Sequence, residues 1–419
     1  MHVPRVLISL AFAASLVGCT TSSPPPASSP PAPAAAAPAA APPPPAAAPT
    51  PPPPAPPAPF PETISRAGER LLADALAAVG TGPRDLVIDP LIDANTGAQT
   101  GGTVAMGQQI ASLVRAKAPS WNVRPLTRTS LANAPLLFIG TLTPINTKND
   151  AQALPDAFRA CMALIDLRTG KLVAKRADRA TVGSVNAEPV AFFRDSPTWA
   201  RDRTANAYIK SCQGSTAGDN ADPTYLIRLP AAALLNEAMT AYDEGKLADA
   251  YRLYREASLV ADPGDLRVLN GMYLTSWKTG KRKEAADAFG RIVEVGLESK
   301  RLPIKLFFNP GTTTLLSNGD LRAQYAVWLK EVAAQAGARE SCIKIVGHTS
   351  RTGAADANDA LSRRRAVAVQ EALERQNKKL APRLTVEGMG SREVLVGLGT
   401  DDLRDALDRR VEFRTVDCT

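Results

Sequence analysis

The sequence predicts an α+β multidomain chain, in which an N-terminal α/β domain and a short helical-repeat region precede a C-terminal β-α-β-α-β-β domain. Three observations predict it. Strand-like and helical patterns alternate over residues 62–225, a helical pattern recurs over 228–300, and strand-like runs enclose two helical patterns over 303–417. The length of 419 residues suits two or three domains of ordinary size.

The first 18 residues predict a cleavable export signal. Arg5 precedes an apolar run, Val6 to Val17, that is too short to span a membrane. The following Leu16-Val17-Gly18-Cys19 resembles a bacterial lipobox, which implies that Cys19 becomes the acylated first residue. In that lipoprotein class Thr20, in place of Asp, implies transfer to the outer membrane, so we expect a lipid-anchored protein facing the periplasm. Plain secretion with a chance cysteine is the alternative.

Residues 19–61 predict a lipidated spacer. The stretch 24–61 consists almost entirely of Pro, Ala and Ser and holds 20 of the 36 prolines. Such a tract cannot bury enough apolar surface to fold, so we expect a polyproline II-like tether that reaches on the order of 120 Å when extended.

Charge and cysteine usage narrow the class of protein. The net charge is +8, but 41 acidic residues nearly balance 49 basic ones and aromatics make up only 5%, which argues against a nucleic-acid partner.

Four further cysteines in an oxidising compartment predict two disulfides with three pairings open. We favour Cys161–Cys212 and Cys342–Cys418, because each pair lies within one expected domain. Buried thiols are the alternative.

The α/β domain has recognisable elements. Ile64 to Val79 is amphipathic, Leu86 to Ile88 and Leu136 to Leu142 are β-like, and two runs around Arg168-Thr169-Gly170 predict a hairpin. Gly97, Gly101 and Gly102 precede a helical stretch, but no Gly-Lys-Ser/Thr follows, so a P-loop is rejected. The order of elements, with Leu86-Val87-Ile88-Asp89, Ile139-Gly140 and Asp166-Leu167-x-Thr169-Gly170, resembles LpoB-like activators of wall synthases and CsgG-like secretion components.

A motif recurs after 35 residues in the next region. Ala241-Tyr242-x-x-Gly245-Lys246 returns as Ser276-Trp277-x-x-Gly280-Lys281. The period resembles tetratricopeptide repeats, in which the Gly admits a tight turn between paired helices. Two units alone rarely form a stable solenoid, so we expect them to pack on a neighbouring domain.

The C-terminal domain shows strand and helix patterns in turn. Ile304, Leu306 and Phe308 alternate as a half-buried strand, and Leu321, Tyr325, Trp328 and Val332 form an apolar stripe at helical spacing. A β-branched run ending at Val346 leads into Gly347-His348-Thr349-Ser350-Arg351-Thr352-Gly353, and a helical pattern follows. Leu384 to Gly388 and Val411 to Val416 predict two further strands.

The loop after Val346 and the following helix predict a binding site. Asn358, Leu361 and Arg365 are spaced i, i+3 and i+7, so they share one helical face beside the polar loop. A guanidinium fork suits a carboxylate, with a charge-assisted pair contributing about 1.5–3 kcal/mol.

These residues resemble the signature of the OmpA-like peptidoglycan-binding domain. The resemblance rests on Gly-His-Thr-x-x-x-Gly, then Asn, Leu-Ser and Arg-Ala, with Gly388-Met389-Gly390 and Arg409-Arg410-Val411-Glu412 near the end. It implies that the stem peptide of a diaminopimelate wall is the partner and that Arg365 holds its carboxylate. The residues expected to bind it are Thr349, Ser350, Asn358, Leu361, Arg365 and Arg409.

One position departs from that family. Ser350 stands where the family has the Asp that holds the diaminopimelate ammonium, and a neutral hydroxyl is a weaker acceptor. Arg351 adds a like charge, whereas Asp356 is a nearby candidate to substitute. For Arg365 a structural ion pair in the Glu412 region is the alternative.

The residue inventory argues against catalysis. His348 is the only histidine after the export signal, which disfavours a metal site, and no nucleophile–base pair can be assembled. We expect no enzyme activity, no cofactor and no metal. The expected function is non-covalent peptidoglycan binding by an outer-membrane lipoprotein that tethers the envelope. The alternative is an adaptor or wall-synthase activator that engages an envelope protein through residues 62–300.

Overall fold

The central strands of the first sheet are buried on both faces, so the sheet lies between two layers of helices. The sheet has the order β2-β1-β3-β4-β5, with β1 (Arg84–Ile88) parallel to β2 (Trp121–Pro125) and to β3 (Leu136–Ile145). β4 (Ala157–Asp166) and β5 (Lys171–Thr181) continue it as an antiparallel hairpin, as the sequence predicts. Because successive side chains point to opposite faces, Leu136 and Phe138 enter one core and Leu137 and Ile139 the other.

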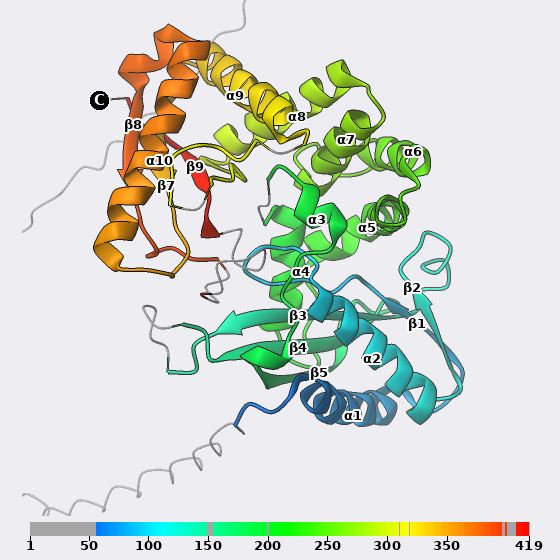
Figure 1. Cartoon of the computed structure of the whole chain (residues 1–419). Coiled ribbons are helices and arrows are strands. Elements are labelled where there is room, and N and C mark those ends of the chain that lie inside the picture. The colour runs from blue at the N-terminus through cyan, green and yellow to red at the C-terminus, as the bar shows by residue number, and fades with distance from the viewer. Residues whose placement is uncertain are drawn as a thin grey trace, which may run out of the picture. The chain divides into compact units, whose positions relative to one another are not determined.

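Helices cover both faces of this sheet. α1 (Phe60–Val79) and α2 (Gly101–Lys117) share the core of Leu136 and Phe138 and lie together along the sheet in Figure 1. α4 (Arg203–Gln213) and the first half of α5 (Pro223–Asp243) pack on the opposite face. The short helix α3 (Ala191–Asp195) comes before α4 in the chain. The computed structural model describes residues 56–148, 154–198, 201–309, 311–317, 319–395, 399 and 408–418, so the expected export signal, Cys19 and nearly all of the spacer lie outside the described residues.

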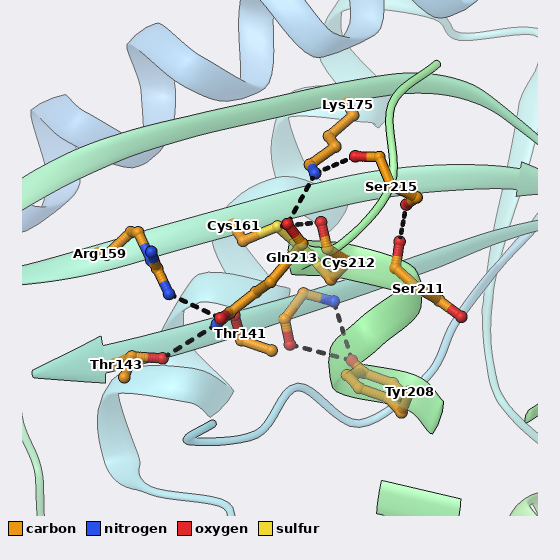
Figure 2. Close-up of a disulfide and its surroundings, with 11 residues drawn as sticks. Thr141, Thr143, Arg159, Cys161, Lys175, Tyr208, Ser211, Cys212, Gln213 and Ser215 are labelled. Carbon is orange, nitrogen blue, oxygen red and sulfur yellow. Dashed lines mark hydrogen bonds between the residues drawn. A yellow bond between two sulfur atoms is a disulfide. The ribbon is translucent and has the colours of Figure 1, made fainter. Parts of the chain in front are cut away.

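A disulfide fastens α4 to the sheet. Cys161 on β4 is joined to Cys212 at the end of α4, and both are buried (Figure 2). Beside it, the Lys175 ammonium donates to the carbonyl oxygens of Gln213 and Ser215, and Arg159 donates to the Gln213 side chain at 2.6 Å. A cation at the C-terminus of a helix is favourable, because the last carbonyl groups lack partners within the helix.

Two helix pairs form the repeat region. α5 is followed by α6 (Leu247–Ser258), and α7 (Leu266–Lys278) by α8 (Arg282–Glu298). Gly245 and Gly280 lie at the two intervening turns with φ of 75° and 79°, so each supplies the left-handed backbone that such a turn requires. α5 runs through positions 225–228, where the sequence analysis places the boundary between the α/β domain and the repeat region, and its two halves contribute to different cores.

The C-terminal domain has the predicted order of elements. These are β6 (Arg301–Ile304), α9 (Leu321–Ala338), β7 (Cys342–Gly347), α10 (Ala355–Gln376), β8 (Leu384–Gly388) and β9 (Val411–Val416). The sheet order is β6-β9-β7-β8. Ile343, Ile345 and Phe413 share a core with both helices, so α9 and α10 cover one face, and Cys342 is joined to Cys418 beyond β9.

The first strand of this domain differs from the expectation. β6 ends at Ile304, and the residues expected to continue it to Phe308 form only an isolated bridge to Leu315. Lys305 interrupts the predicted alternation, because it is buried and its backbone N–H donates to Pro197 at 2.9 Å. The chain therefore leaves the sheet and turns toward α3.

One apolar core joins the helix pairs to the C-terminal domain. Trp328 on α9 stacks on Phe289 of α8, with ring centres 5.5 Å apart, and donates a 2.7 Å hydrogen bond to Tyr273 of α7. The repeat region thus buries its apolar face against a neighbour. Among the described helices, none has the length and hydropathy that a membrane span requires.

Candidate functional site

A close approach between β7 and α10 places the polar loop. A Cβ at Gly347 would lie 2.1 Å from the carbonyl oxygen of Ser362, and one at Gly388 would lie 2.7 Å from the backbone nitrogen of Arg363. Only glycine allows the ends of β7 and β8 to lie this near the helix. The loop that follows Gly347 is therefore held directly against the first turns of α10.

Asn358 fixes the shape of this loop. Its side-chain amide donates to the carbonyl oxygens of Thr352 at 2.9 Å and Ser350 at 3.4 Å, and its side chain is buried. The hydroxyl groups of Ser350 and Thr352 are 2.9 Å apart and hydrogen-bonded. Asn358 thus holds the loop backbone, and it also lines the pocket as one of the residues that the sequence analysis expects to bind a ligand.

Arg365 is buried, with 2% of its surface exposed. Its Nε donates to the carbonyl oxygen of Thr312 at 3.1 Å, and its guanidinium carbon lies 4.9 Å from the centre of the Phe308 ring. The hydrogen bond and the aromatic face fix the direction of the guanidinium fork. The Glu412 carboxylate, the alternative partner from sequence, pairs with Arg410 at 2.7 Å and Arg414 at 3.2 Å.

The expected ligand residues meet in one pocket of about 860 Å³. Its walls include all six of them: Thr349, Ser350, Asn358, Leu361, Arg365 and Arg409. They come from the loop after β7, from α10 and from the approach to β9, and β7 pairs with β9 along its whole length. Sheet pairing therefore carries Arg409 to the loop and helix that precede it in the chain.

The remaining walls come from outside the predicted motif. Trp277 and Lys278 of α7 and Asp195 of α3 line the same pocket, together with Phe308 and Trp328. Sequence reasoning missed the first three as site residues, since they lie 70 or more positions before the loop. The long-range packing of α7 and α3 brings them there.

Lys305 is a further pocket residue that the sequence analysis missed. It is 2% exposed, and its ammonium donates to the carbonyl oxygens of Phe193 at 2.5 Å and Arg194 at 3.1 Å. Burial lowers the pKa of Lys305 to about 7, with nearby Asp195 opposing the shift. The sequence signal that could have identified this residue is a lysine placed directly between two apolar residues, Ile304 and Leu306, both of which are buried.

Two carboxylates line the pocket among the described residues, and both already accept hydrogen bonds. Asp195 accepts from Tyr242 at 2.7 Å and Lys278 at 2.8 Å. Although burial opposes it, these bonds hold the pKa of Asp195 below its ordinary value. Asp320 accepts from the Trp277 indole at 3.3 Å. Asp356, the expected substitute for an acid at position 350, is exposed and does not belong to the pocket lining.

A second polar cluster lies on the other face of the C-terminal sheet. Ligand atoms of His348, Glu393 and Glu412 lie within 4.8 Å of one another, a spacing that could hold a cation. However, Arg410 and Arg414 already donate to these carboxylates. A metal ion would therefore have to compete with two guanidinium groups for these carboxylates.

The arrangement suits binding of an anion. A buried guanidinium, a buried lysine and several hydroxyl groups face a mainly apolar pocket whose described lining includes no histidine or cysteine. In such surroundings a charge-assisted hydrogen bond is stronger than one in water.

Comparison with protein families identifies the domain that holds this loop and helix. Residues 307–406 match the sequence model of the OmpA family. No curated protein matches the chain in a sequence comparison.

Solved structures match between 28% and 31% of this chain. The peptidoglycan-associated lipoprotein from Burkholderia pseudomallei is 22% identical, and the match covers 29% of this chain and 92% of that one, with a TM-score of 0.23. The cell wall anchor of the T6SS from Pseudomonas aeruginosa is 19% identical over 31% of this chain and 97% of its own, with a TM-score of 0.25. The periplasmic domain of MotB from Helicobacter pylori is 17% identical over 28% and 81%, with a TM-score of 0.22.

Proposed function

We propose that this chain, which carries an OmpA-family domain at residues 307–406, binds peptidoglycan non-covalently through the pocket around Arg365. The observation that carries the proposal is the convergence of all six expected ligand residues on that one pocket. A stem-peptide carboxylate at the Arg365 fork would form charge-assisted hydrogen bonds, and Leu361 and Phe308 would contact its aliphatic part.

Co-sedimentation with purified diaminopimelate-type sacculi tests this proposal. Arg365→Ala should lower the retained fraction at least tenfold, because the carboxylate loses its cationic partner. Arg364→Ala is the matched control, since that side chain is exposed on the same helix. Thermal unfolding of both variants separates loss of the site from loss of the fold, and unchanged retention of a folded Arg365→Ala protein would contradict the proposal.

We further propose that Cys19 is acylated and that the chain tethers the outer membrane to the wall. The lipobox-like residues 16–19 and the long Pro/Ala spacer support this. Cys19→Ser should move the protein from the membrane fraction to the soluble periplasmic fraction. Sacculus binding of the purified variant should be unchanged, since the anchor and the pocket are separate.

The second candidate, a protein adaptor acting through residues 62–300, is favoured by exposed apolar side chains. Ile227, Leu259 and Val260 are 74%, 84% and 52% exposed. A photocrosslinking residue at position 259 should capture an envelope protein if this role exists, and the absence of an adduct in cells would argue against it. Neither proposal involves catalysis, and release of muropeptides from sacculi by the pure protein would contradict that expectation.

A further inference from the structure

Part of the wall of the Arg365 pocket comes from outside the OmpA-family domain. Leu274, Trp277 and Lys278 of α7 line the pocket, and so does Asp195 at the end of α3. These four residues form what we term the helical wall, and all of them precede the segment that matches the OmpA family. The loop and helix that carry Arg365 therefore supply only a part of the lining.

The charges on the helical wall are paired with one another. Asp195 accepts a hydrogen bond from Lys278 at 2.8 Å and pairs with Arg194 at 3.3 Å. The side chains of Leu274 and Trp277 add apolar surface beside this cluster. Because its charged groups already have partners, the wall suits contact with an uncharged, aliphatic part of a guest.

Neighbouring groups fix the aromatic side chains of this region before a guest binds. The Trp277 indole donates to Asp320 at 3.3 Å, and the guanidinium carbon of Arg282 lies 3.9 Å from the centre of the Trp277 ring. Trp328, which also lines the pocket, donates to Tyr273 at 2.7 Å. Little conformational freedom is therefore lost when a guest contacts these rings, which favours binding.

The size of the cavity indicates how much of a guest it can enclose. Its volume of about 860 Å³ lies near the upper end of the range of about 300–1,000 Å³ that is typical of small-molecule pockets. Pockets of this size enclose most of a drug-sized molecule. A single amino acid held at Arg365 would leave much of the cavity to water, so the dimensions suit a guest of several residues.

We propose that the pocket encloses several residues of a stem peptide between α10 and the helical wall, so that α7 takes part directly in peptidoglycan binding. This inference rests on the proposed peptidoglycan binding and adds to it a contact surface that lies outside the OmpA-family domain. Arg365 holds a carboxylate of the peptide, and Leu274 and Trp277 contact its aliphatic part.

Calorimetric titration of the full chain with two ligands tests this inference. The ligands are free meso-diaminopimelate and the tripeptide L-Ala-γ-D-Glu-meso-diaminopimelate. The wild type should bind the tripeptide at least about tenfold more tightly, because only the longer ligand can contact both sides of the pocket. Leu274→Ala should weaken tripeptide binding about fivefold, since it removes apolar contact area, and should leave binding of the free amino acid unchanged.

The matched control is Leu266→Ala. Leu266 lies on the same helix and is 7% exposed, against 3% for Leu274, but it does not belong to the described lining of the pocket. Thermal unfolding should show a loss of stability in both variants, whereas only Leu274→Ala should lose affinity for the tripeptide. Leu274→Val makes a smaller change at the same position and should weaken tripeptide binding in the same direction, so it replaces Leu274→Ala if that variant does not fold.

The possible results separate this inference from the proposed function. Equal affinity of the wild type for the two ligands would overturn the inference, and so would a folded Leu274→Ala protein with unchanged affinity for the tripeptide. Equal losses of affinity in Leu266→Ala and Leu274→Ala would also overturn it, because α7 would then act through stability alone.

Retention on sacculi decides whether the proposed function falls with the inference. If the wild type is retained on sacculi and Arg365→Ala is not, peptidoglycan binding stands after any of these three results. Retention of the wild type on sacculi without binding of either small ligand would likewise overturn the inference alone. Loss of both ligand binding and retention by the wild type would overturn the proposed function and the inference together.

Discussion

The ammonium group of Lys305 donates a 2.5 Å hydrogen bond to the backbone carbonyl of Phe193. This contact joins the segment after β6 to α3, which lies more than 100 positions earlier in the chain. The contact holds the Lys305 ammonium, buried, at the wall of the ligand pocket. Burying a charged group costs free energy, so the stability of the protein should depend on whether Lys305 carries a proton.

Lys305 should make the protein more stable at alkaline pH. Burial lowers its pKa from 10.5 to about 7, so between these values the unfolded chain holds a proton that the native protein has released. The free energy of unfolding therefore rises with pH from about 7 to about 10.5, and below pH 7 the full cost of burying the ammonium is present. Lys305→Met should reduce this rise by about 2 kcal/mol or more between pH 6.5 and 9.5, as measured by urea unfolding.

The matched control for this experiment is Lys283→Met. Lys283 is 89% exposed, and its pair with Asp287 one turn away on α8 raises its pKa, so both states keep its proton between pH 6.5 and 9.5 and its replacement should leave the slope in that range unchanged. Equal slopes in Lys305→Met and the wild type would show that the native state keeps the Lys305 proton at alkaline pH.

The hydrogen bond between Trp328 and Tyr273 should couple α9 to α7. Trp328→Phe and Tyr273→Phe each remove one partner of a buried 2.7 Å bond, so each should lower the free energy of unfolding by about 1 kcal/mol. The double variant should lose less than the sum of the two, with a coupling energy of about 0.5–1.5 kcal/mol. Additive losses in urea unfolding would mean that the helix pair and the OmpA-family domain are not held together by this contact.

Gly347→Ala should displace the loop that holds Ser350. The new Cβ would meet the backbone oxygen of Ser362 at 2.1 Å, and a backbone atom cannot move aside without shifting α10. We expect a loss of about 2–4 kcal/mol in stability and weaker retention on sacculi. Gly183→Ala is the control, because a Cβ there meets no atom within 4 Å. A crystal structure of Gly347→Ala with α10 in place would contradict this reasoning.

The Cys342–Cys418 disulfide should stabilise the C-terminal sheet. It joins the start of β7 to the chain beyond β9 and closes a segment of 76 residues. Its removal in Cys342→Ala/Cys418→Ala should cost about 2–4 kcal/mol, mainly through the entropy of the unfolded chain. In a denaturant titration, a reducing agent should shift the midpoint of the wild type more than that of the variant, which retains only Cys161–Cys212. Equal shifts would assign the stabilisation to the other disulfide.

Local patterns predicted most elements that have strong periodicity. Ile64 to Val79 lies in α1, and the runs at 384–388 and 411–416 are β8 and β9. β2 escaped prediction because a strand of five residues carries little periodic signal, whereas α4 was missed although its 11 residues form an amphipathic helix. The prediction that the first strand of the C-terminal domain continues to Phe308 was wrong for a different reason. The contact of Lys305 with α3 draws the chain out of the sheet, although apolar residues alternate along this segment.

The sequence by itself determined which residues gather around Arg365, because a helix repeats every 3.6 residues and a strand-to-loop junction places its neighbours within a few positions. Thr349, Ser350, Asn358, Leu361 and Arg365 lie within 17 positions of one another, so local geometry was enough to assign them to one site. Only the tertiary structure decided the opposite wall, where Asp195, Trp277 and Lys305 arrive from α3, α7 and the turn after β6. Their placement depends on how one apolar core packs across the helix pairs and the OmpA-family domain. These three residues lie 45 to 155 positions before Ser350, and contacts over such distances produce no periodic pattern in the sequence.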